Sequence, residues 1–380
     1  MNNPAPSLSL ESRRAMHNAN KLKLGLFGAN CSSGRAVTLV PERWSGDWPD
    51  NKKLARLADD VGIDFMLPIG RWKGYGGETD YQGATLETIT WATGLLAATK
   101  RITVFGTVHA PIFNPVVAAK QMVTADHIGE GRFGLNIVVG WNEGEFDMFG
   151  VRQREHDARY DYAQEWIDVI KLIWSDRENF DFTGQYLDMK GIRGKPKPYG
   201  GVRPLIMNAG ASAVGQAFAV KNCDAFFFSA SRTSLEETAQ RARTALDAAR
   251  AHGREIGCYT VGVITCRPTK KEAEDYFHHC IVEHADWSAV DANLALRKIS
   301  PETVGMEKFL MHRSQYAQGN SGLPIIGDPD YVAKQLADLS QAGVTGIAVS
   351  LINYADELPY FADEVIGRLE RMGLREKVRN

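Results

Sequence analysis

Asn136 is the first residue whose position suggests chemistry, because it lies in the middle of an apolar stretch. The segment "GRFGLNIVVGW", residues 131–141, otherwise has the composition of a buried strand between glycines. Burying a side-chain amide without a hydrogen bond costs about 1–3 kcal/mol. Asn136 therefore needs a partner, which is either the backbone of a neighbouring strand or a bound ligand.

Other apolar stretches are also followed by small, polar or aromatic residues. These lack the paired carboxylates of a glycosidase, a His-x-His metal motif and a GxSxG nucleophile motif. Amides, hydroxyls, an arginine and aromatic rings suit a planar, hydrogen-bonding cofactor better than acid–base hydrolysis. The groups concerned are Gly28-Ala29-Asn30-Cys31, Gly70-Arg71-Trp72, Thr107-Val108-His109, Val139-Gly140-Trp141, Asn208-Ala209-Gly210 and Ser229-Ala230.

A metal site is not expected from the spacing of the cysteines and histidines. The five cysteines are odd in number and form no CxxC pair, so we expect reduced thiols, with Cys31 a buried, inert one. His278 and His279 are adjacent in the sequence and therefore poorly placed to share one ion.

Eight short apolar runs alternate with segments of helical period, such as 51–62, 156–175 and 357–372. Most of the runs are continuously apolar, as expected of parallel strands buried on both faces. Eight strand–helix units predict an α/β fold of the TIM (β/α)8 barrel type, whose chemistry lies at the carboxyl ends of the strands. The runs are 22–29, 63–70, 102–110, 131–141, 203–212, 223–230, 259–266 and 345–352.

One segment interrupts this alternation after the seventh strand. We interpret residues 276–326 as an insertion that forms a lid over the mouth of the barrel; the alternative is a set of helices packed on the outside. Residues 22–380 are then a single barrel domain, preceded by an N-terminal extension, residues 1–21.

Composition argues against several partners. The formal net charge is −2, from 44 basic and 46 acidic residues, and no basic stripe suggests a nucleic acid. The apolar runs are too short to span a membrane. Residues 1–21 lack the apolar core of a signal peptide, so we expect a cytoplasmic protein.

Several consecutive blocks resemble the bacterial luciferase-like flavin monooxygenases, and most closely the branch of the pyrimidine and dimethyl-sulfone monooxygenases. The resemblance covers residues 22–265 and resumes at 327–351. The blocks that carry it are "GRWKGYGGETDYQGATLETITWATGLLAATKRITVFGT", "NPVVAAKQMVTADHIGEGRFGLNIVVGWNEGEFDMFG", "HDARYDYAQEWIDVIKLIW", "NAGASAVGQAFA" and "GDPDYVAKQLADLSQAGVTGIAVSL".

The resemblance implies a two-component, FMNH2-dependent monooxygenase. Reduced FMN, supplied by an NAD(P)H:flavin reductase, reacts with O2 in such enzymes to give a flavin peroxide, at N5 in the pyrimidine enzyme. The peroxide oxidises a small molecule with cleavage of a carbon–heteroatom bond, in an N-heterocycle amide or an organosulfur compound. Family members are commonly homodimers or homotetramers, so a homo-oligomer is expected here.

By the same resemblance, Asn136 matches an asparagine that contacts the isoalloxazine, and Thr107 matches a threonine that completes the oxygen pocket. Glu145 matches a flavin-contacting glutamate. Taken alone, Asn136 could bond only to backbone, Thr107 could be an ordinary strand residue and Glu145 a surface acid.

The resemblance also implies a site for the ribityl phosphate. Arg159 and Tyr160 match residues beside this group, and Ser212 matches a phosphate ligand next to the small Gly210. The alternative is that Arg159 and Tyr160 belong to a solvated helix face.

Gly70 and Arg71 fall where the pyrimidine enzyme has an Ile-Lys pair that contacts the flavin. The departure keeps the positive charge but leaves only backbone at the first position. His109 is a candidate catalytic or substrate-contacting residue, although it could be hydrogen-bonded filler. The aromatic residues predicted at the mouth, as possible neighbours of the substrate, are Trp44, Trp48, Trp72 and Trp141.

Three other functions remain open at this stage. An oxidoreductase that uses the deazaflavin F420 shares this barrel. A hydrolase would need carboxylates or histidines at the strand ends, which this sequence does not place there. A non-catalytic flavin-binding protein would bind FMN without substrate-dependent oxygen uptake.

Overall fold

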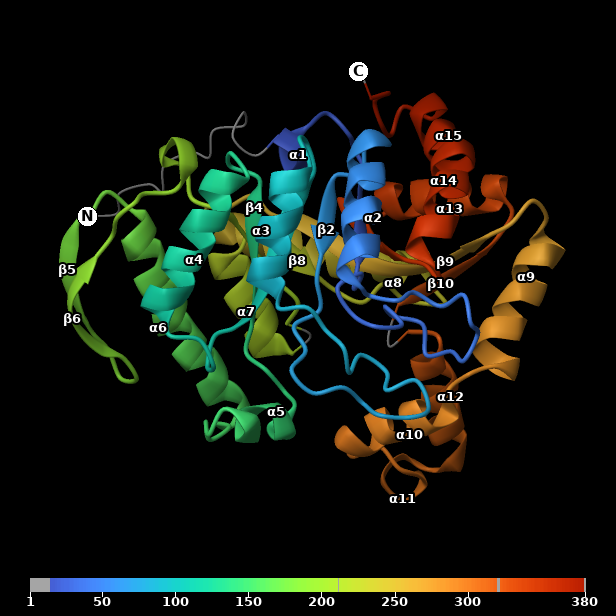
Figure 1. Ribbon diagram of the computed structural model, residues 1–380, viewed down its shortest axis with the longest axis horizontal. Helices are drawn as coiled ribbons and strands as arrows, with labels where there is room; N and C mark the ends of the chain where they lie inside the picture. Colours follow the sequence, from blue (N-terminus) through green and yellow to red (C-terminus); the bar gives the residue numbers. More distant parts are fainter. Residues whose placement is uncertain (1–13, 211, 320–321, 379–380) are drawn as a thin grey trace.

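A computed structural model describes residues 14–210, 212–319 and 322–378, and contains a closed barrel of eight parallel strands (Figure 1). β1 pairs with β2 on one side and β11 on the other, while β8 pairs with β9 and closes the ring. The predicted TIM barrel is therefore confirmed. Its strands are β1 (Lys23–Phe27), β2 (Phe65–Leu67), β3 (Thr103–His109), β4 (Phe133–Val138), β7 (Leu205–Asn208), β8 (Ala225–Phe227), β9 (Gly257–Cys266) and β11 (Gly346–Ser350).

Helices cover the outer face of the barrel. Local capping explains where several of them begin: Asn114 accepts hydrogen bonds from Val116 and Val117 at the start of α4, where Pro115 occupies the first turn. The outer helices are α2 (Trp48–Asp60), α3 (Thr88–Ala98), α4 (Pro115–Ile128), α6 (His156–Trp174), α7 (Ala213–Asn222), α8 (Leu235–Ala251), α13 (Pro329–Gln341) and the continuous run α14 (Tyr354–Phe361), η4 (Ala362–Ile366) and α15 (Gly367–Arg371).

The alternation of side chains along the strands fills the barrel interior. Phe65, Phe105, Met207 and Tyr259 form an apolar cluster that is separate from the cluster beneath the outer helices. Because side chains two residues apart share a face, Thr107 follows Phe105 on the inward face of β3. Apolar side chains thus fill the layer below Thr107, and Thr107 begins a polar layer near the carboxyl ends of the strands.

Among the described residues, four α-helices, one π-helix and a short strand lie between β9 and α13. They are α9 (Lys270–His278), η3 (His279–Glu283), α10 (Trp287–Leu296), α11 (Pro301–Val304), α12 (Met306–Ala317) and β10 (Leu323–Gly327). The segment 276–326 thus starts within α9 and ends within β10, which extends the sheet by pairing with β9; residues 320–321 lie outside the described residues.

The inserted helices contact loops at the carboxyl end of the barrel. The Asp286 side chain accepts hydrogen bonds from the Thr79 amide and hydroxyl, both at 2.8 Å, and its backbone N–H donates to Val37. Figure 1 shows α10, α11 and α12 at the same edge as α5 (Glu143–Met148), opposite α1 (Arg14–His17) and α15.

Two parts of the fold have no counterpart in the sequence prediction. An antiparallel hairpin, β5 (Asn179–Thr183) and β6 (Asp188–Arg193), and the short turn η2 (Tyr199–Gly201) lie between α6 and β7.

Of the predicted N-terminal extension, residues 1–13 lie outside the described residues, while Met16 of α1 packs against the interior cluster. Among the described residues, no helix is both long and apolar enough to cross a bilayer.

A buried ion pair joins the end of the chain to the start of the barrel. Arg375 donates to Asp64 at 2.6 Å, and the two side chains are 2 % and 0 % exposed. Asp64 also accepts from the Leu24 amide and from the side chains of Asn18 and Asn20.

We predict that Arg375→Met lowers the free energy of unfolding by about 3–5 kcal/mol, because it removes the ion-pair partner of the buried Asp64 carboxylate and leaves only Lys23 as a nearby cation. Arg313→Met, which breaks a surface pair with Asp291, is the control and should cost less than about 1 kcal/mol. Urea denaturation measures both. Equal losses of unfolding free energy in the two variants would show that the buried Arg375–Asp64 pair contributes no more to stability than a surface pair.

Candidate active site at the mouth of the barrel

Thr107 and Asn136 face each other across the β3–β4 ladder and are both buried. The Asn136 Nδ2 donates to the Thr107 Oγ1 at 3.1 Å, and that hydroxyl donates in turn to the Pro68 carbonyl at 2.6 Å. The direction of the Thr107 hydroxyl is therefore fixed, and its proton is not available to another group.

The Asn136 Oδ1 is buried and has no hydrogen-bond partner. The alternative in which Asn136 bonds only to backbone is thus wrong. Its nitrogen pairs with the Thr107 side chain, and its oxygen is unpaired. Because buried acceptors are usually hydrogen-bonded, we expect a bound molecule to donate to this oxygen, for example through a ring N–H.

His109 lies two residues further along β3, and its Nδ1 is also buried and unpaired. Burial lowers the pKa of His109 to about 4; the nearby Glu145 acts in the opposite direction and Arg71 in the same direction as burial. The ring is therefore neutral at neutral pH and offers one acceptor and one donor nitrogen.

Gly70 allows the loop after β2 to approach His109 and Thr107. A Cβ at this position would lie 2.8 Å from the His109 Cε1 and 3.0 Å from the Thr107 Cγ2. Glycine at position 70 therefore has a steric reason. Any larger residue at position 70 would displace one of the two polar side chains.

The same loop is held by Glu145 of α5. Its buried Oε1 accepts from the Arg71 guanidinium at 3.1 Å and from the Trp72 amide at 2.8 Å. Glu145 is thus no surface acid: it fixes the backbone on which Gly70 and Arg71 lie. Asn30 holds the other side of the loop through both polar atoms of its amide, which pair with the Ile69 backbone.

A second polar cluster lies where α6 and α7 begin. Arg159 donates to the Gly140 carbonyl after β4, which connects this cluster to the first one, and its Nε is buried and unpaired. Ser212 caps α7 by accepting from the Gly215 amide at 3.1 Å.

Tyr160 completes this second cluster. Its ring packs so closely on Gly215 that a Cβ there would lie 2.5 Å from the phenol oxygen. Burial raises the pKa of Tyr160, opposed by a side-chain hydrogen bond with Ser212, so the hydroxyl is neutral and able to donate. Gly210 packs against Gly215 in the same way, and a Cβ on it would meet the Gly215 Cα at 2.6 Å.

The two clusters together have the chemistry that reduced or oxidised FMN requires. One end offers two unpaired hydrogen-bonding atoms, the Asn136 Oδ1 and the His109 Nδ1, beneath a loop without a side chain at position 70. The other end offers a guanidinium, a phenol and a helix N-terminus, which suit a phosphate. The residues present therefore fit this cofactor.

The aromatic residues predicted at the mouth divide into two groups. Trp141 stacks on Tyr75 at 6.5 Å and lies beneath the Arg297 guanidinium at 3.9 Å, while Trp72 contacts Phe113 and Phe149. The prediction was wrong for Trp44 and Trp48. Trp44 is 2 % exposed and donates to the Ala29 carbonyl in the core, and Trp48 packs on Gly94 of α3 among the outer helices.

Three residues of the site were not singled out from the sequence. Asn142 is buried with an unpaired Nδ2, Tyr75 supports Trp141, and Arg297 reaches the mouth from the inserted helices. Asn142 lies in the same "WNEGEF" motif as Glu145, which was a usable signal. Nothing in the sequence connects Arg297 to a position more than 150 residues earlier.

The cysteines take no part in this site. All five are buried and free, as predicted, and burial raises the pKa of the Cys31 thiol to about 12. Cys31 is therefore protonated and inert at neutral pH.

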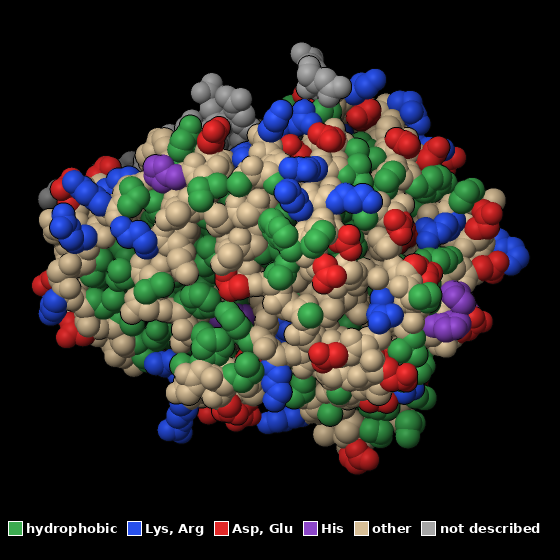
Figure 2. All heavy atoms as spheres, in the orientation of Figure 1, with side chains coloured by type: hydrophobic (Ala, Val, Ile, Leu, Met, Phe, Trp, Pro, Cys, Tyr) green, Lys and Arg blue, Asp and Glu red, His purple; other side chains and the backbone are tan. Residues whose placement is uncertain are grey.

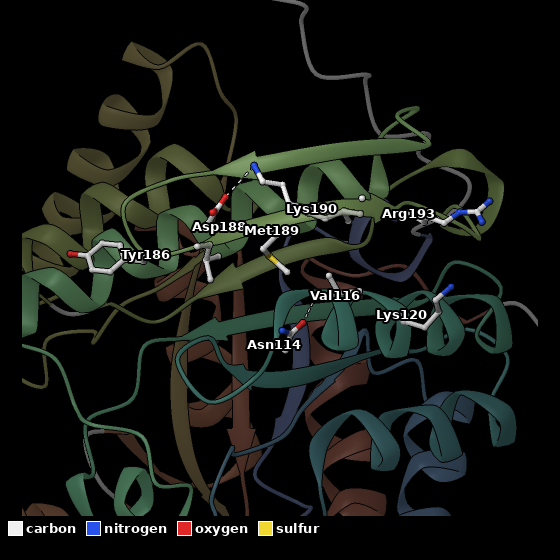
Figure 3. A pocket seen from close by; sticks show the side chains of 11 residues that line it. Asn114, Val116, Lys120, Tyr186, Asp188, Met189, Lys190 and Arg193 are labelled. Atoms are coloured by element: carbon white, nitrogen blue, oxygen red, sulfur yellow. Dashed lines mark hydrogen bonds and ion pairs between the residues drawn. The ribbon is translucent and has the colours of Figure 1, made fainter.

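A separate groove of about 670 Å³ lies between the β5–β6 hairpin and α4 (Figure 3). It is lined by Asn114, Val116, Lys120 and residues 186–193. None of the predicted site residues lines it, so it is not a part of the candidate active site.

The sequence matches the family model "Luciferase-like monooxygenase" over residues 24–346. The chain belongs to this family. It is 30 % identical to the FMNH(2)-dependent dimethylsulfone monooxygenase of Pseudomonas fluorescens (strain Pf0-1), over 91 % of this chain and 93 % of that protein. It is 29 % identical to the pyrimidine monooxygenase RutA of Enterobacter sp. (strain 638), over 68 % of this chain and 71 % of that protein. The predicted branch of the family is thereby confirmed.

The fold of this luciferase-like chain is also that of solved structures. The crystal structure of DmoA from Hyphomicrobium sulfonivorans superposes with a TM-score of 0.85 at 19 % identity, over 95 % of this chain and 90 % of that one. A crystal structure of riboflavin lyase (RcaE) with modified FMN and riboflavin gives 0.84 at 20 % identity, over 95 % and 94 %. At such identities the likeness concerns the fold.

We predict that Asn136→Leu raises the free energy of unfolding of the ligand-free protein by about 1 kcal/mol, because it removes an unpaired buried oxygen. Asn208→Leu is the matched control. Its amide is fully paired, with the Ile137 carbonyl and the Gly210 amide, so its loss should cost about 1–3 kcal/mol. Urea denaturation measures the free energy of unfolding of both variants. A destabilised Asn136→Leu variant would contradict the interpretation that the Asn136 oxygen is buried without a partner.

Acidification should destabilise the folded protein through His109. The pKa of His109 is lowered from 6.5 to about 4 in the folded state, so the unfolded chain binds a proton that the folded protein excludes. As the pH falls from 6.5 to 4, this group should cost roughly 3 kcal/mol of stability. His109→Gln should therefore lose less stability on acidification than the unmodified protein, measured by urea midpoints across this range. His252→Gln, which replaces an exposed histidine away from the site, is the control variant.

Proposed function

We propose that this luciferase-like protein is an FMNH2-dependent monooxygenase that oxidises a small molecule and cleaves a carbon–heteroatom bond. The observation that carries the proposal is the Thr107–Asn136 pair, whose free amide oxygen is buried at the barrel mouth. The names of two relatives, the dimethylsulfone and pyrimidine monooxygenases, support the same reaction class.

In this proposal the two polar clusters hold the two ends of FMN. Asn136, Gly70 and the Arg71–Glu145 pair would line the ring, and Glu145 keeps their backbone in place. Arg159, Tyr160, Gly210 and Ser212 would hold the ribityl phosphate at the N-terminus of α7. When bound and reduced, the flavin supplies the electrons that activate O2.

Thr107 and Asn136 would form the polar wall against which oxygen binds. The Thr107 hydroxyl proton is held by the Pro68 carbonyl, so this group presents only a lone pair, whereas the Asn136 amide has a second N–H to donate. Neutral His109, beside them, would hydrogen-bond the substrate without adding a charge. Each such hydrogen bond is worth about 1 kcal/mol.

The inserted segment 276–326 would act as the lid. Oxygen chemistry of this class requires a site from which water is excluded, because water diverts the reducing equivalents to hydrogen peroxide. Arg297 supports this role, since its guanidinium covers Trp141 at 3.9 Å and so joins the inserted helices to the mouth. Together with Trp72, Trp141 would then contact a small substrate.

Two kinds of partner follow from this function. A flavin reductase would supply FMNH2, because the dimethylsulfone monooxygenase that this chain resembles is FMNH2-dependent. We also propose a homodimer or homotetramer, and exposed apolar side chains on α10 and α12 provide a surface for it: Leu296, Met306, Leu310 and Met311.

The test is an anaerobic titration with FMNH2, followed by mixing with oxygen in the presence of dimethyl sulfone or a pyrimidine. Arg159→Met should weaken FMNH2 binding at least ~10-fold, because it removes a charge-assisted contact. Thr107→Val and Asn136→Ala should bind FMNH2 but release a larger share of the reducing equivalents as hydrogen peroxide. Lys271→Gln, on the exposed face of α9, is the control.

Other outcomes would replace the proposal. Binding of F420 and not of FMNH2 would assign the protein to the deazaflavin oxidoreductases. Tight FMN binding without oxygen uptake stimulated by any N-heterocycle or organosulfur compound would make it a flavin-binding protein.

A further inference from the structure

Three potential metal ligands meet on the surface of the inserted segment. One ligand atom from each of His279, Glu283 and His284 lies within 4.8 Å of the other two. In Figure 2 histidine side chains gather beside acidic ones at the right-hand edge, over the lower end of α9. This group is not a part of the candidate active site.

The backbone explains why residues five apart come together. η3 is a turn of π-helix, and the His284 amide donates to the His279 carbonyl at 3.0 Å, which is the i→i+5 bond of that turn. In an α-helix, five residues correspond to about 140° beyond one full turn, so the two rings would point apart. Here their centroids are 4.2 Å apart. Such π-turns occur often at functional sites.

The orientation of the His284 ring is that of a prepared metal ligand. Its Nδ1 lies 3.0 Å from the His279 carbonyl oxygen, and beside a carbonyl this nitrogen must carry the proton. The lone pair is then on Nε2. A histidine that ligates a metal usually donates its other N–H to a carbonyl or carboxylate in this way.

The spacing around Glu283 also fits. Its Oε2 is 3.3 Å from the His279 Nδ1, and its Oε1 is 3.3 Å from the Nδ1 of His278. Two ligand atoms bound to one zinc ion at about 2.1 Å, in a tetrahedral arrangement, are about 3.4 Å apart. The side chains are thus already near the separation that a shared ion would impose.

We propose that His279, Glu283 and His284, with His278 next to them, bind a divalent transition-metal ion of the zinc class. Imidazole and carboxylate are ligands that such ions accept, and water would complete the coordination because the site is exposed. The sequence interpretation considered only the adjacent His278 and His279 and expected no metal site.

The position of the site suggests what the ion would stabilise. The His284 carbonyl accepts from the Leu39 amide at 2.6 Å, and the Cys280 carbonyl accepts from the Thr38 hydroxyl at 2.6 Å. The π-turn therefore carries the contact between the inserted segment and the loop after β1. An ion bound across the turn would stiffen this contact.

The experiment is calorimetric titration of the full-length, tag-free protein with ZnCl2, with CoCl2 as a spectroscopic probe. We expect saturable binding of one ion per chain and visible Co²⁺ bands of a four- or five-coordinate site. His279→Ala, His284→Ala and Glu283→Gln should each weaken binding at least ~10-fold. His252→Ala removes an exposed histidine elsewhere and should leave the affinity unchanged.

A second measurement separates a built site from adsorption. Hydrogen exchange of residues 278–286 should slow on addition of Zn²⁺ in the unmodified protein but not in His284→Ala, whose fold circular dichroism verifies. Absence of saturable binding would overturn the proposal, as would equal weakening by His252→Ala and His279→Ala.

Discussion

The register of β3 against β4 is the constraint on which the rest of the site depends. It places Thr107 opposite Asn136 on the inward face of the barrel, so that one hydrogen bond joins them. A slip of β4 by one residue would turn Asn136 toward the outer helices and bring an apolar neighbour to the mouth in its place. The packed interior enforces the register, because Phe105 and Met207 fill the layer beneath the polar pair.

The site is held in place by residues that are themselves fully paired, and this allows a few polar atoms to stay free. Asn30 and Glu145 use their oxygens on the backbone of the loop after β2, and Asn208 pairs on both sides of its amide. The free atoms, such as the Asn136 Oδ1, each cost stability in the absence of a ligand. A barrel with a large buried core tolerates that cost, and a ligand that pairs with these atoms recovers it.

The eight strands could be predicted because parallel strands buried on both faces are continuously apolar, and the residues at their ends then fell at one edge by the geometry of the fold. Side-chain direction could not be predicted in the same way. Trp44 lies in the loop after the first strand and Trp72 in the loop after the second, yet Trp44 points into the core. The β5–β6 hairpin was missed because its strands are mostly exposed and carry no apolar run. The contact of His279 with His284 depends on a π-turn, which has no recognised sequence signal.

Stacked aromatic rings and guanidinium groups connect the inserted helices to Glu145, whereas the hydrogen bonds of Asp286 join these helices to Thr79 and Val37 in the neighbouring loops. Arg297 lies on Trp141, Trp141 stacks on Tyr75, and Arg71 lies over the Tyr75 ring while it pairs with Glu145. Stacked contacts tolerate small displacements better than the directional bond between Thr107 and Asn136. The insertion can therefore differ in sequence, and shift, without moving the atoms proposed to hold the cofactor. Under the proposed function, such a division would let the substrate change while the oxygen chemistry stays the same.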